Sequence, residues 1–241
     1  MKKTGFYVVS VLIVLVTAVV TFFAITAVSS NLQETAFHAS MEEYRKAINA
    51  EVADVDTINE LSETINCEGY YGAVEGAAKE YMRDLFVPYY TAKSLENKEI
   101  FKNGITKKLI ESDQPQFEKT IETLDEMDGY LTLIYVAADS LFNRDTALEY
   151  FGLAEDLTED NEYFFGLYEE QVEELYTNEK LKNDLFEYYE IMNKKLVVYK
   201  EVIDFLVANN GSWRLEGDSV VFTTTWLTNQ YNQMLANLTQ E

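Results

Sequence analysis

An uninterrupted apolar stretch near the beginning of the chain, residues 6–28, constrains this sequence more than any other feature. No charged residue lies between Lys3 and Glu34. As a helix, this stretch of 23 residues would rise about 34 Å, enough to cross a hydrocarbon core of about 30 Å. Because Lys2 and Lys3 precede the stretch, we expect the N-terminus to be cytoplasmic and the following domain to lie on the other side of the cell membrane.

The apolar stretch divides the chain into three predicted segments. Residues 1–5 form a cytoplasmic N-terminus, residues 6–28 form a transmembrane signal-anchor helix in the lipid bilayer, and residues 29–241 form an extracytoplasmic domain. A cleaved signal peptide is the alternative, but such a peptide has an apolar core of about 7–15 residues and a small-residue cleavage site. The longer stretch favours a single-pass anchor that stays attached.

The residues in front of the stretch suggest another possibility. Lys2, Lys3, Thr4 and Gly5 before Phe6 resemble the processing site of type IV pilins and pseudopilins. The resemblance covers this first segment only, and it implies cleavage after Gly5 and assembly into a filament or secretion system. At the fifth position after that cut the family usually carries Glu, whereas this chain has Ser10. The β-sheet of a pilin is also hard to find in the later sequence.

Four small or hydroxyl-bearing residues fall on one face of the predicted membrane helix. Such residues let membrane helices approach one another closely. Residues that a bilayer merely tolerates would give the same pattern, because no Gly-x-x-x-Gly pair accompanies them. The residues that would form this packing face are Ser10, Thr17, Thr21 and Ala24.

The rest of the chain is strongly acidic. The sequence has 42 Asp and Glu against 19 Lys and Arg, a net charge of −23, and every acidic residue follows the apolar stretch. A nucleic-acid-binding surface is basic, so we expect no nucleic-acid partner. Hydrophobic residues make up 47% of the chain, which is too much for a disordered segment. Only two prolines occur, and this scarcity favours long helices.

Helical periodicity begins soon after the predicted anchor. No glycine or proline occurs from Phe6 to Glu68, so the pattern predicts one helix that runs from the membrane to about residue 65. Ser29 to Asn31 is the only soft point we expect. The apolar residues that recur at every third or fourth position are Phe37, Met41, Tyr44, Ile48, Val52, Val55, Ile58, Leu61 and Ile65.

The later sequence predicts further helices and one small hairpin. Pro88 is expected to break or kink a second helix over residues 73–87. Residues 212–222 alternate around Glu216-Gly217-Asp218 and predict a β-hairpin. We therefore expect an all-α fold, an antiparallel helical bundle with this hairpin near its C-terminus. Asp113-Gln114-Pro115 predicts the start of another helix, whose apolar residues recur from Phe117 to Phe142. Further helices are predicted over residues 146–154, 162–175, 181–206 and 225–239.

Few residue patterns indicate chemistry. His38 is the only histidine and Cys67 the only cysteine, so a histidine-based triad, a di-iron site and a cysteine zinc site are not expected. We predict no catalytic and no cofactor-binding residue. The only metal candidate is a weak calcium site at Asp156, Glu159, Asp160 and Glu162, which lacks the glycine of an EF-hand.

Two groups of residues are candidates for interaction with another protein. Tyr89 and Tyr90 lie side by side in the sequence, and tyrosine suits interfaces because it has an apolar body and a polar tip. Lys102, Lys107 and Lys108 belong to the one net-positive stretch outside the predicted membrane segment. Helix seams filled by aromatic rings, and lysines paired with the chain's own acidic faces, would explain the same residues.

In outline the chain resembles the extracytoplasmic helical-bundle sensor domains of bacterial chemoreceptors. Those receptors also have a second membrane pass and a cytoplasmic output domain, and neither is found in this sequence. We therefore expect a binding, sensing or scaffolding accessory subunit that acts through a protein partner or self-association. The alternatives are a pilin-like subunit and a surface hydrolase that uses two of the many carboxylates.

Overall fold

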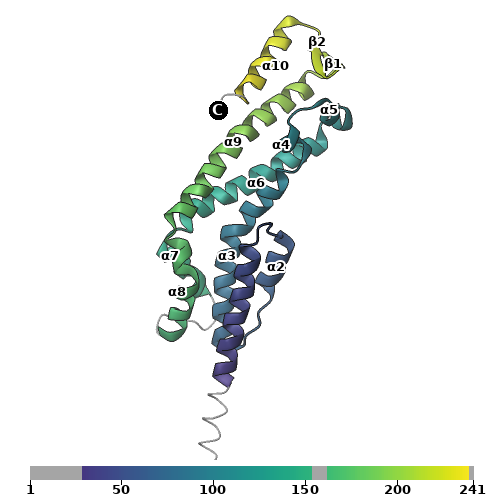
Figure 1. Cartoon of the computed structure of the whole chain (residues 1–241). Helices are drawn as coiled ribbons and strands as arrows, with labels where there is room; N and C mark the ends of the chain where they lie inside the picture. The colour runs from purple at the N-terminus through teal and green to yellow at the C-terminus, as the bar shows by residue number, and fades with distance from the viewer. Residues whose placement is uncertain (1–28, 154–161, 239–241) are drawn as a thin grey trace, which may run out of the picture.

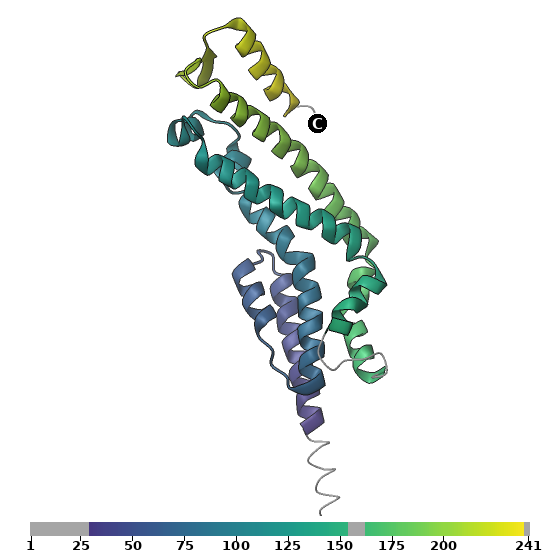
Figure 2. The ribbon, with the colours of Figure 1, turned by 180° about the vertical axis from the view of Figure 1, so that it is seen from behind.

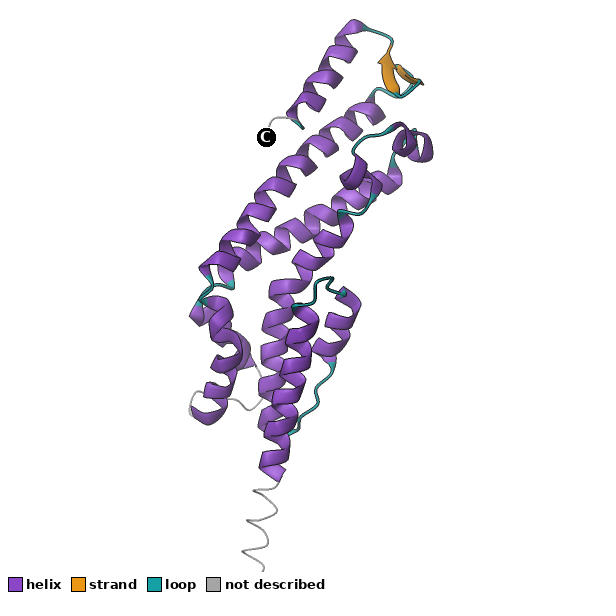
Figure 3. Ribbon diagram, viewed as in Figure 1, coloured by secondary structure: helices purple, strands orange, loops and turns teal. Residues whose placement is uncertain are grey.

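A computed structural model describes residues 29–153 and 162–238 (Figure 1). The molecule is elongated and mostly helical, with a small two-stranded antiparallel sheet near its C-terminus (Figure 3). Its first described element is helical backbone over residues 29–48. The elements that follow are α2 (Val55–Glu63), α3 (Gly69–Leu95), α4 (Glu99–Asn103), α5 (Lys107–Asp113), α6 (Glu118–Ser140), α7 (Arg144–Leu153), α8 (Glu162–Tyr176), α9 (Glu179–Ala208), β1 (Trp213–Glu216), β2 (Ser219–Phe222) and α10 (Thr225–Asn237).

Helix 29–48 lies beside α3 and runs in the same direction (Figures 1 and 2). Ser40 bonds to Glu75, and Tyr44 bonds to the carbonyl of Lys79, so both pairs are 35 residues apart in sequence. A constant separation means that the two helices are aligned in parallel. We call helix 29–48, α2 and the first half of α3 (residues 69–82) the base of the molecule.

The predicted continuous helix to residue 65 is wrong. Helical backbone ends at residue 48, and a new helix, α2, begins at Val55. The side chain of Asp54 accepts the amide of Asp56 and caps α2, which gives the chain a favourable place to start again. The periodic pattern also continues through Val52, although this residue is 86% exposed. Ser29 to Asn31, the expected soft point, is helical.

Pro88 does not end its helix either. α3 begins at Gly69 rather than at residue 73 and continues through Pro88 to Leu95. A proline inside a helix costs about 3 kcal/mol because it removes a hydrogen bond and crowds the preceding turn. Ala92 and Leu95 are buried beyond it. Burial of this last stretch therefore outweighs the local cost.

The second large unit, which we call the arm, consists of α6, α9, the hairpin and α10. α6 and α9 pack along their lengths and run in opposite directions (Figure 2). The apolar residues that recur at helical spacing in the sequence of α9 are largely buried, namely Leu185, Met192, Tyr199, Val202 and Leu206. Leu196 is buried next to Lys195, where this spacing lapses. α6 begins at Glu118 and not at the predicted Pro115, because Asp113 still belongs to α5. Leu124, Leu131 and Ala138 are buried on α6 as their helical spacing predicts, whereas Tyr135 is exposed and Ile134 is buried in its place.

The hairpin is confirmed, with Trp213 paired to Phe222 at its open end and Glu216 paired to Ser219 at its turn. Phe222 packs its ring against Phe205 of α9 and Tyr231 of α10. This contact gives a two-stranded sheet the apolar support that it lacks in isolation. The last helix is also present, from Thr225 to Asn237.

The predicted membrane segment, with Ser10, Thr17, Thr21 and Ala24, lies outside the described residues. Within residues 29–153 and 162–238, no helix combines the length and the apolar composition that crossing a bilayer requires. The lipid contact of residues 6–28 therefore stays a prediction.

Candidate functional site

An apolar groove lies between α3, α6 and α7, with a cavity of about 610 Å³. Val87 and Pro88 of α3 and Tyr130 and Ala137 of α6 contribute to its walls. Its most accessible apolar side chains are Leu133, Val136 and Leu153, which are 50%, 51% and 79% exposed. Large apolar side chains gathered in one concave place are a usual mark of an interaction surface.

The polar rim of this groove is more acidic than basic. Arg83 pairs with Asp84 at 2.9 Å, and the hydroxyl of Tyr150 donates to the other oxygen of Asp84 at 3.0 Å. Burial and the neighbouring Asp84 carboxylate raise the pKa of the Tyr150 phenol, so this donor keeps its proton. Glu149 adds a second exposed carboxylate.

Further acidic residues lie on the helices that line the groove, at helical spacing from residues of its lining. Asp56 and Glu63 lie three residues before and four residues after Asn59, which lines the groove from α2. Glu126 lies one turn before Tyr130 on α6. Apolar walls with an acidic border suit a partner that carries apolar and basic side chains on one face.

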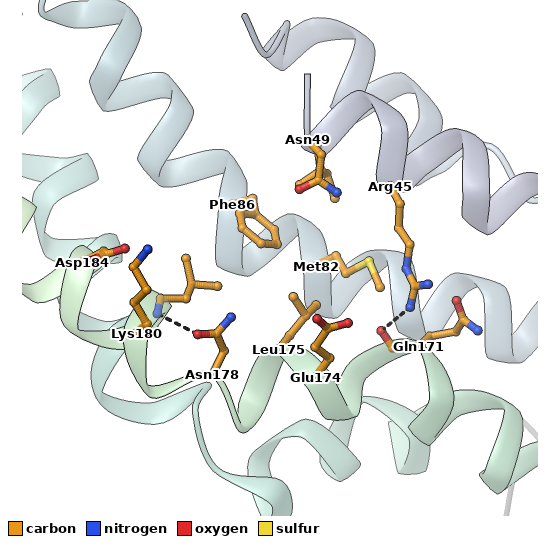
Figure 4. Close-up of a pocket in the computed structure, with 12 residues that line it drawn as sticks. Arg45, Asn49, Met82, Phe86, Gln171, Glu174, Leu175, Asn178, Lys180 and Asp184 are labelled. Atoms are coloured by element: carbon orange, nitrogen blue, oxygen red, sulfur yellow. Dashed lines mark hydrogen bonds between the residues drawn. The ribbon is translucent and has the colours of Figure 1, made fainter. Parts of the chain in front are cut away.

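A second cavity, which we call the polar pocket, has a volume of about 380 Å³ (Figure 4). It lies where the end of helix 29–48 meets α3 and the junction between α8 and α9. Its residues come from all four elements. They are Arg45, Ile48, Asn49, Met82, Phe86, Gln171, Glu174, Leu175, Asn178, Lys180, Leu181 and Asp184.

Hydrogen bonds between side chains and the backbone fix two sides of the polar pocket (Figure 4). Arg45 donates from Nη2 to the carbonyl of Gln171 at 3.0 Å and to that of Glu170 at 3.4 Å, which ties helix 29–48 to α8. Asn178 accepts the amide of Leu181 at 3.0 Å and caps the first turn of α9. These bonds therefore hold helix 29–48, α8 and the start of α9 in place around the pocket.

A buried polar cluster lies in the base, around an ion pair between Lys79 and Glu75. The two side chains are 1% and 0% exposed, and Nζ lies 2.7 Å from Oε1. Lys79 also donates to the Ser40 hydroxyl and to the carbonyl of Thr64, at 2.9 and 2.7 Å. Glu75 in turn accepts the backbone amide of Cys67 at 3.0 Å.

Hydrogen bonding decides the charge of Glu75. Burial alone would raise its pKa, but hydrogen bonds from Lys79, Ser40 and the amide of Asn66 outweigh burial and lower the pKa below its ordinary value. A lysine beside a serine can activate the hydroxyl as a nucleophile when the amine is neutral. Here Glu75 engages the Lys79 ammonium, and Ser40 is only 5% exposed. This geometry suits a structural role, in which the cluster holds helix 29–48 and the segment before α3 against α3.

The tyrosine pair proposed for interaction makes internal contacts. Tyr90 donates to the carbonyl of Ile48 at 2.6 Å. Tyr89 packs edge-on against Tyr188 of α9, with ring centroids 5.0 Å apart, and Lys93 lies over both of these rings. Both tyrosines are half-buried, so they join α3 to helix 29–48 and to α9.

The lysines proposed for interaction lie on or next to α4 and α5. Lys107 lies 3.8 Å from Glu111, and Lys108 lies 3.1 Å from Glu99. Lys102 is exposed. Two of the three lysines are therefore paired with acidic residues of the same chain.

Of the remaining predicted residues, His38, Cys67 and Glu162 line neither cavity. His38 is exposed on helix 29–48. Burial, followed by contact with Glu75, raises the pKa of the Cys67 thiol to about 12. Asp156, Glu159 and Asp160 of the calcium candidate lie outside the described residues, and Glu162 is exposed at the start of α8. Among the described residues no cluster of His, Cys, Asp and Glu could hold a metal ion.

Neither cavity was predicted from the sequence. The groove has a usable signal, because Tyr130, Leu133 and Val136 form a second apolar stripe on α6 beside the buried one. The polar pocket has none, since its residues come from segments as far apart as Arg45 and Asp184.

Comparison with known proteins identifies no relative of this chain: no family model, curated protein or solved structure matches it.

Proposed function

We propose that this protein is a membrane-anchored, extracytoplasmic accessory subunit that binds a partner protein. The partner would dock a basic amphipathic helix of its own in the apolar groove. Residues 6–28 would hold the subunit to the membrane with its N-terminus in the cytoplasm. The observation that carries the proposal is the exposure of Leu133, Val136 and Leu153 in a concave site on an otherwise acidic chain.

The shape of the site favours a helix as the docked element. The groove is bordered by helices α3, α6 and α7, and an amphipathic helix can place apolar side chains at every third or fourth position into such a groove. Each valine- or leucine-sized side chain that becomes fully buried contributes about 1.5–3 kcal/mol. A few such anchors suffice for a specific contact.

Charge favours a basic partner. The chain carries a net charge of −23, and Asp84 and Glu149 border the groove against Arg83 alone. Complementary charge mainly raises the rate of association and the specificity for a partner, and it adds less to the affinity of the complex. We therefore expect lysine or arginine at the edges of the docked helix and weaker binding at high salt.

A synthetic helix of leucine and lysine tests the proposal against the full-length protein in detergent micelles. Fluorescence anisotropy of the labelled peptide gives its dissociation constant. Val136→Asp should weaken binding at least tenfold, since tenfold corresponds to 1.4 kcal/mol, about the contribution of one buried valine. The added Asp makes the protein more acidic, and charge attraction alone would therefore strengthen binding of the basic peptide. Weaker binding would thus report loss of the apolar contact in the groove.

The matched control is Val197→Asp on α9. Val197 is 47% exposed, close to the 51% of Val136, and it is not among the residues of the groove. The control should bind within twofold of the wild type. Equal binding by both variants would show that general acidity attracts the peptide, and the groove would lose its proposed role.

The N-terminus of the mature protein tests the anchor. An intact Met1–Lys3 in membrane fractions that resist carbonate extraction supports a signal anchor. A first residue of Phe6 would instead support the pilin-like alternative, and recovery of a protein without residues 6–28 would overturn the anchor.

A further inference from the structure

We infer that the polar pocket binds a small zwitterion, a molecule that carries one carboxylate, one ammonium group and an apolar body. The cavity measures about 380 Å³, within the range of about 300–1,000 Å³ usual for small-molecule sites. This inference rests on a different cavity from the groove and is independent of the proposed function.

The floor of the pocket is apolar. Ile48, Met82 and Phe86 line it from helix 29–48 and α3, and Leu175 and Leu181 line it from α8 and α9. Met82 and Ile48 are buried. Such a floor would take up an aliphatic or aromatic side chain, and methionine adapts to ligands of different shape.

Two cations give the pocket its affinity for a carboxylate. Lys180 lies in the first turn of α9, where the positive end of the helix dipole also favours an anion. The guanidinium of Arg45 carries five N–H groups, and the carbonyl contacts described above use only Nη2. The cap residue Asn178 adds an amide at the same side as Lys180.

Two carboxylates give the same pocket its affinity for an ammonium group. Glu174 lies on the last turns of α8 and Asp184 on the second turn of α9, and both are exposed. Figure 4 shows Glu174 between the Arg45 and Lys180 sides of the opening. An ammonium group can thus be held while the carboxylate of the same molecule faces a cation.

The balance of charge selects the zwitterion. Arg45 and Lys180 match Glu174 and Asp184, so the lining is neutral in a chain whose net charge is −23. A simple anion would meet two carboxylates, and a simple cation would meet two cations. Only a ligand with both charges pairs with a cation and a carboxylate of the lining at the same time.

The test uses three probes that share one apolar body. L-leucine carries both charges, 3-methylbutylamine has only the ammonium group, and 4-methylpentanoate has only the carboxylate. Titration calorimetry with the full-length protein in micelles should show the tightest binding for leucine among the three. We expect each single-charge probe to bind at least tenfold more weakly. Equal binding of either one would overturn the zwitterion assignment.

Variants locate the site. Glu174→Gln and Lys180→Met should each weaken leucine binding about tenfold, and both positions are exposed, so the fold should be kept. The matched controls are Glu187→Gln and Lys194→Met, which are exposed on α9 and lie outside the pocket. They should change binding less than twofold. A panel of all twenty standard L-amino acids extends the test, and absence of binding by every member would overturn the inference.

Discussion

The base and the arm of this molecule both bury apolar side chains, but the base adds a buried polar cluster. In the base, the charged pair Glu75 and Lys79 is buried completely and joins helix 29–48, α3 and the segment before α3 through directional hydrogen bonds. In the arm, α6 packs against α9, and the Tyr135 ring of α6 contacts the rings of Phe186 and Tyr189 of α9.

The ion pairs of the arm lie at its surface. Lys200 of α9 contacts Asp125 and Asp128 of α6 at 2.9 and 2.7 Å, with its side chain 31% exposed. Such pairs are screened by water and salt. The comparison teaches that the base adds directional polar contacts to its apolar core, whereas the arm depends on shape and apolar burial.

The largest expected effect comes from breaking the polar cluster of the base. Lys79→Met should lower the free energy of unfolding by about 3–5 kcal/mol, because it leaves Glu75 charged and buried without its partner. Urea unfolding followed by circular dichroism measures the change. Lys46→Met, which removes an exposed pair with Glu42, is the control and should have little effect. A loss below 1 kcal/mol for Lys79→Met would remove the distinction between base and arm.

A cavity in the arm should cost somewhat less. Leu206 is fully buried on α9, and Leu206→Ala should lower the free energy of unfolding by about 2–4 kcal/mol through lost burial and the space left behind. Hydrogen exchange should show the loss first in α10 and the hairpin, since α10 packs on α9 and Phe222 of the hairpin packs against Phe205 of α9. Faster exchange throughout the base instead would mean that the two units unfold together.

A change of pH should affect the base through Glu75. Its pKa in the folded protein is lower than its ordinary value of 4.5, so its stabilising contribution is present above that value and is lost as pH falls through the folded pKa. The difference in unfolding free energy between the wild type and Glu75→Gln should therefore shrink between pH 7 and pH 3. A constant difference over this range would show that the charge of Glu75 does not stabilise the base.

The smallest effect is expected at the surface of the arm. Lys200→Met should lower the free energy of unfolding by about 1 kcal/mol or less, because the pairs it removes are partly solvated. The difference should disappear in 1 M salt, where the Debye length is about 3 Å. A loss as large as that of Lys79→Met would mean that ion pairs stabilise both units equally.

The spacing of apolar residues predicted those helices and strands in which the same residues are buried in the structure. α9, the hairpin and the last helix follow the expected residues. Phe37, Met41, Tyr44 and Ile48 are buried as their spacing requires. Errors arose where long-range contacts decide. The end of a helix at residue 48 and the passage of α3 through Pro88 both depend on what the neighbouring segments bury.

The sites were harder to predict than the helices. Tyrosine pairs and lysine clusters are visible in sequence, yet Tyr89 meets Tyr188 and Lys108 meets Glu99 within the same chain. Cavities form where segments distant in sequence leave space between them, and residue type alone does not encode that space. The second apolar stripe at Leu133 and Val136 was the one signal that could have been read beforehand.

The parallel alignment of helix 29–48 with α3 has a mechanical consequence. A pull on residue 29 along the helix axis would act on the Ser40–Glu75 and Tyr44–Lys79 contacts at the same time, because both join the helices at the same 35-residue separation. Contacts loaded together in this shear geometry resist more force than contacts that peel apart one after another. Tension applied at residue 29 would therefore be transmitted to α3 through both contacts before helix 29–48 separates from α3.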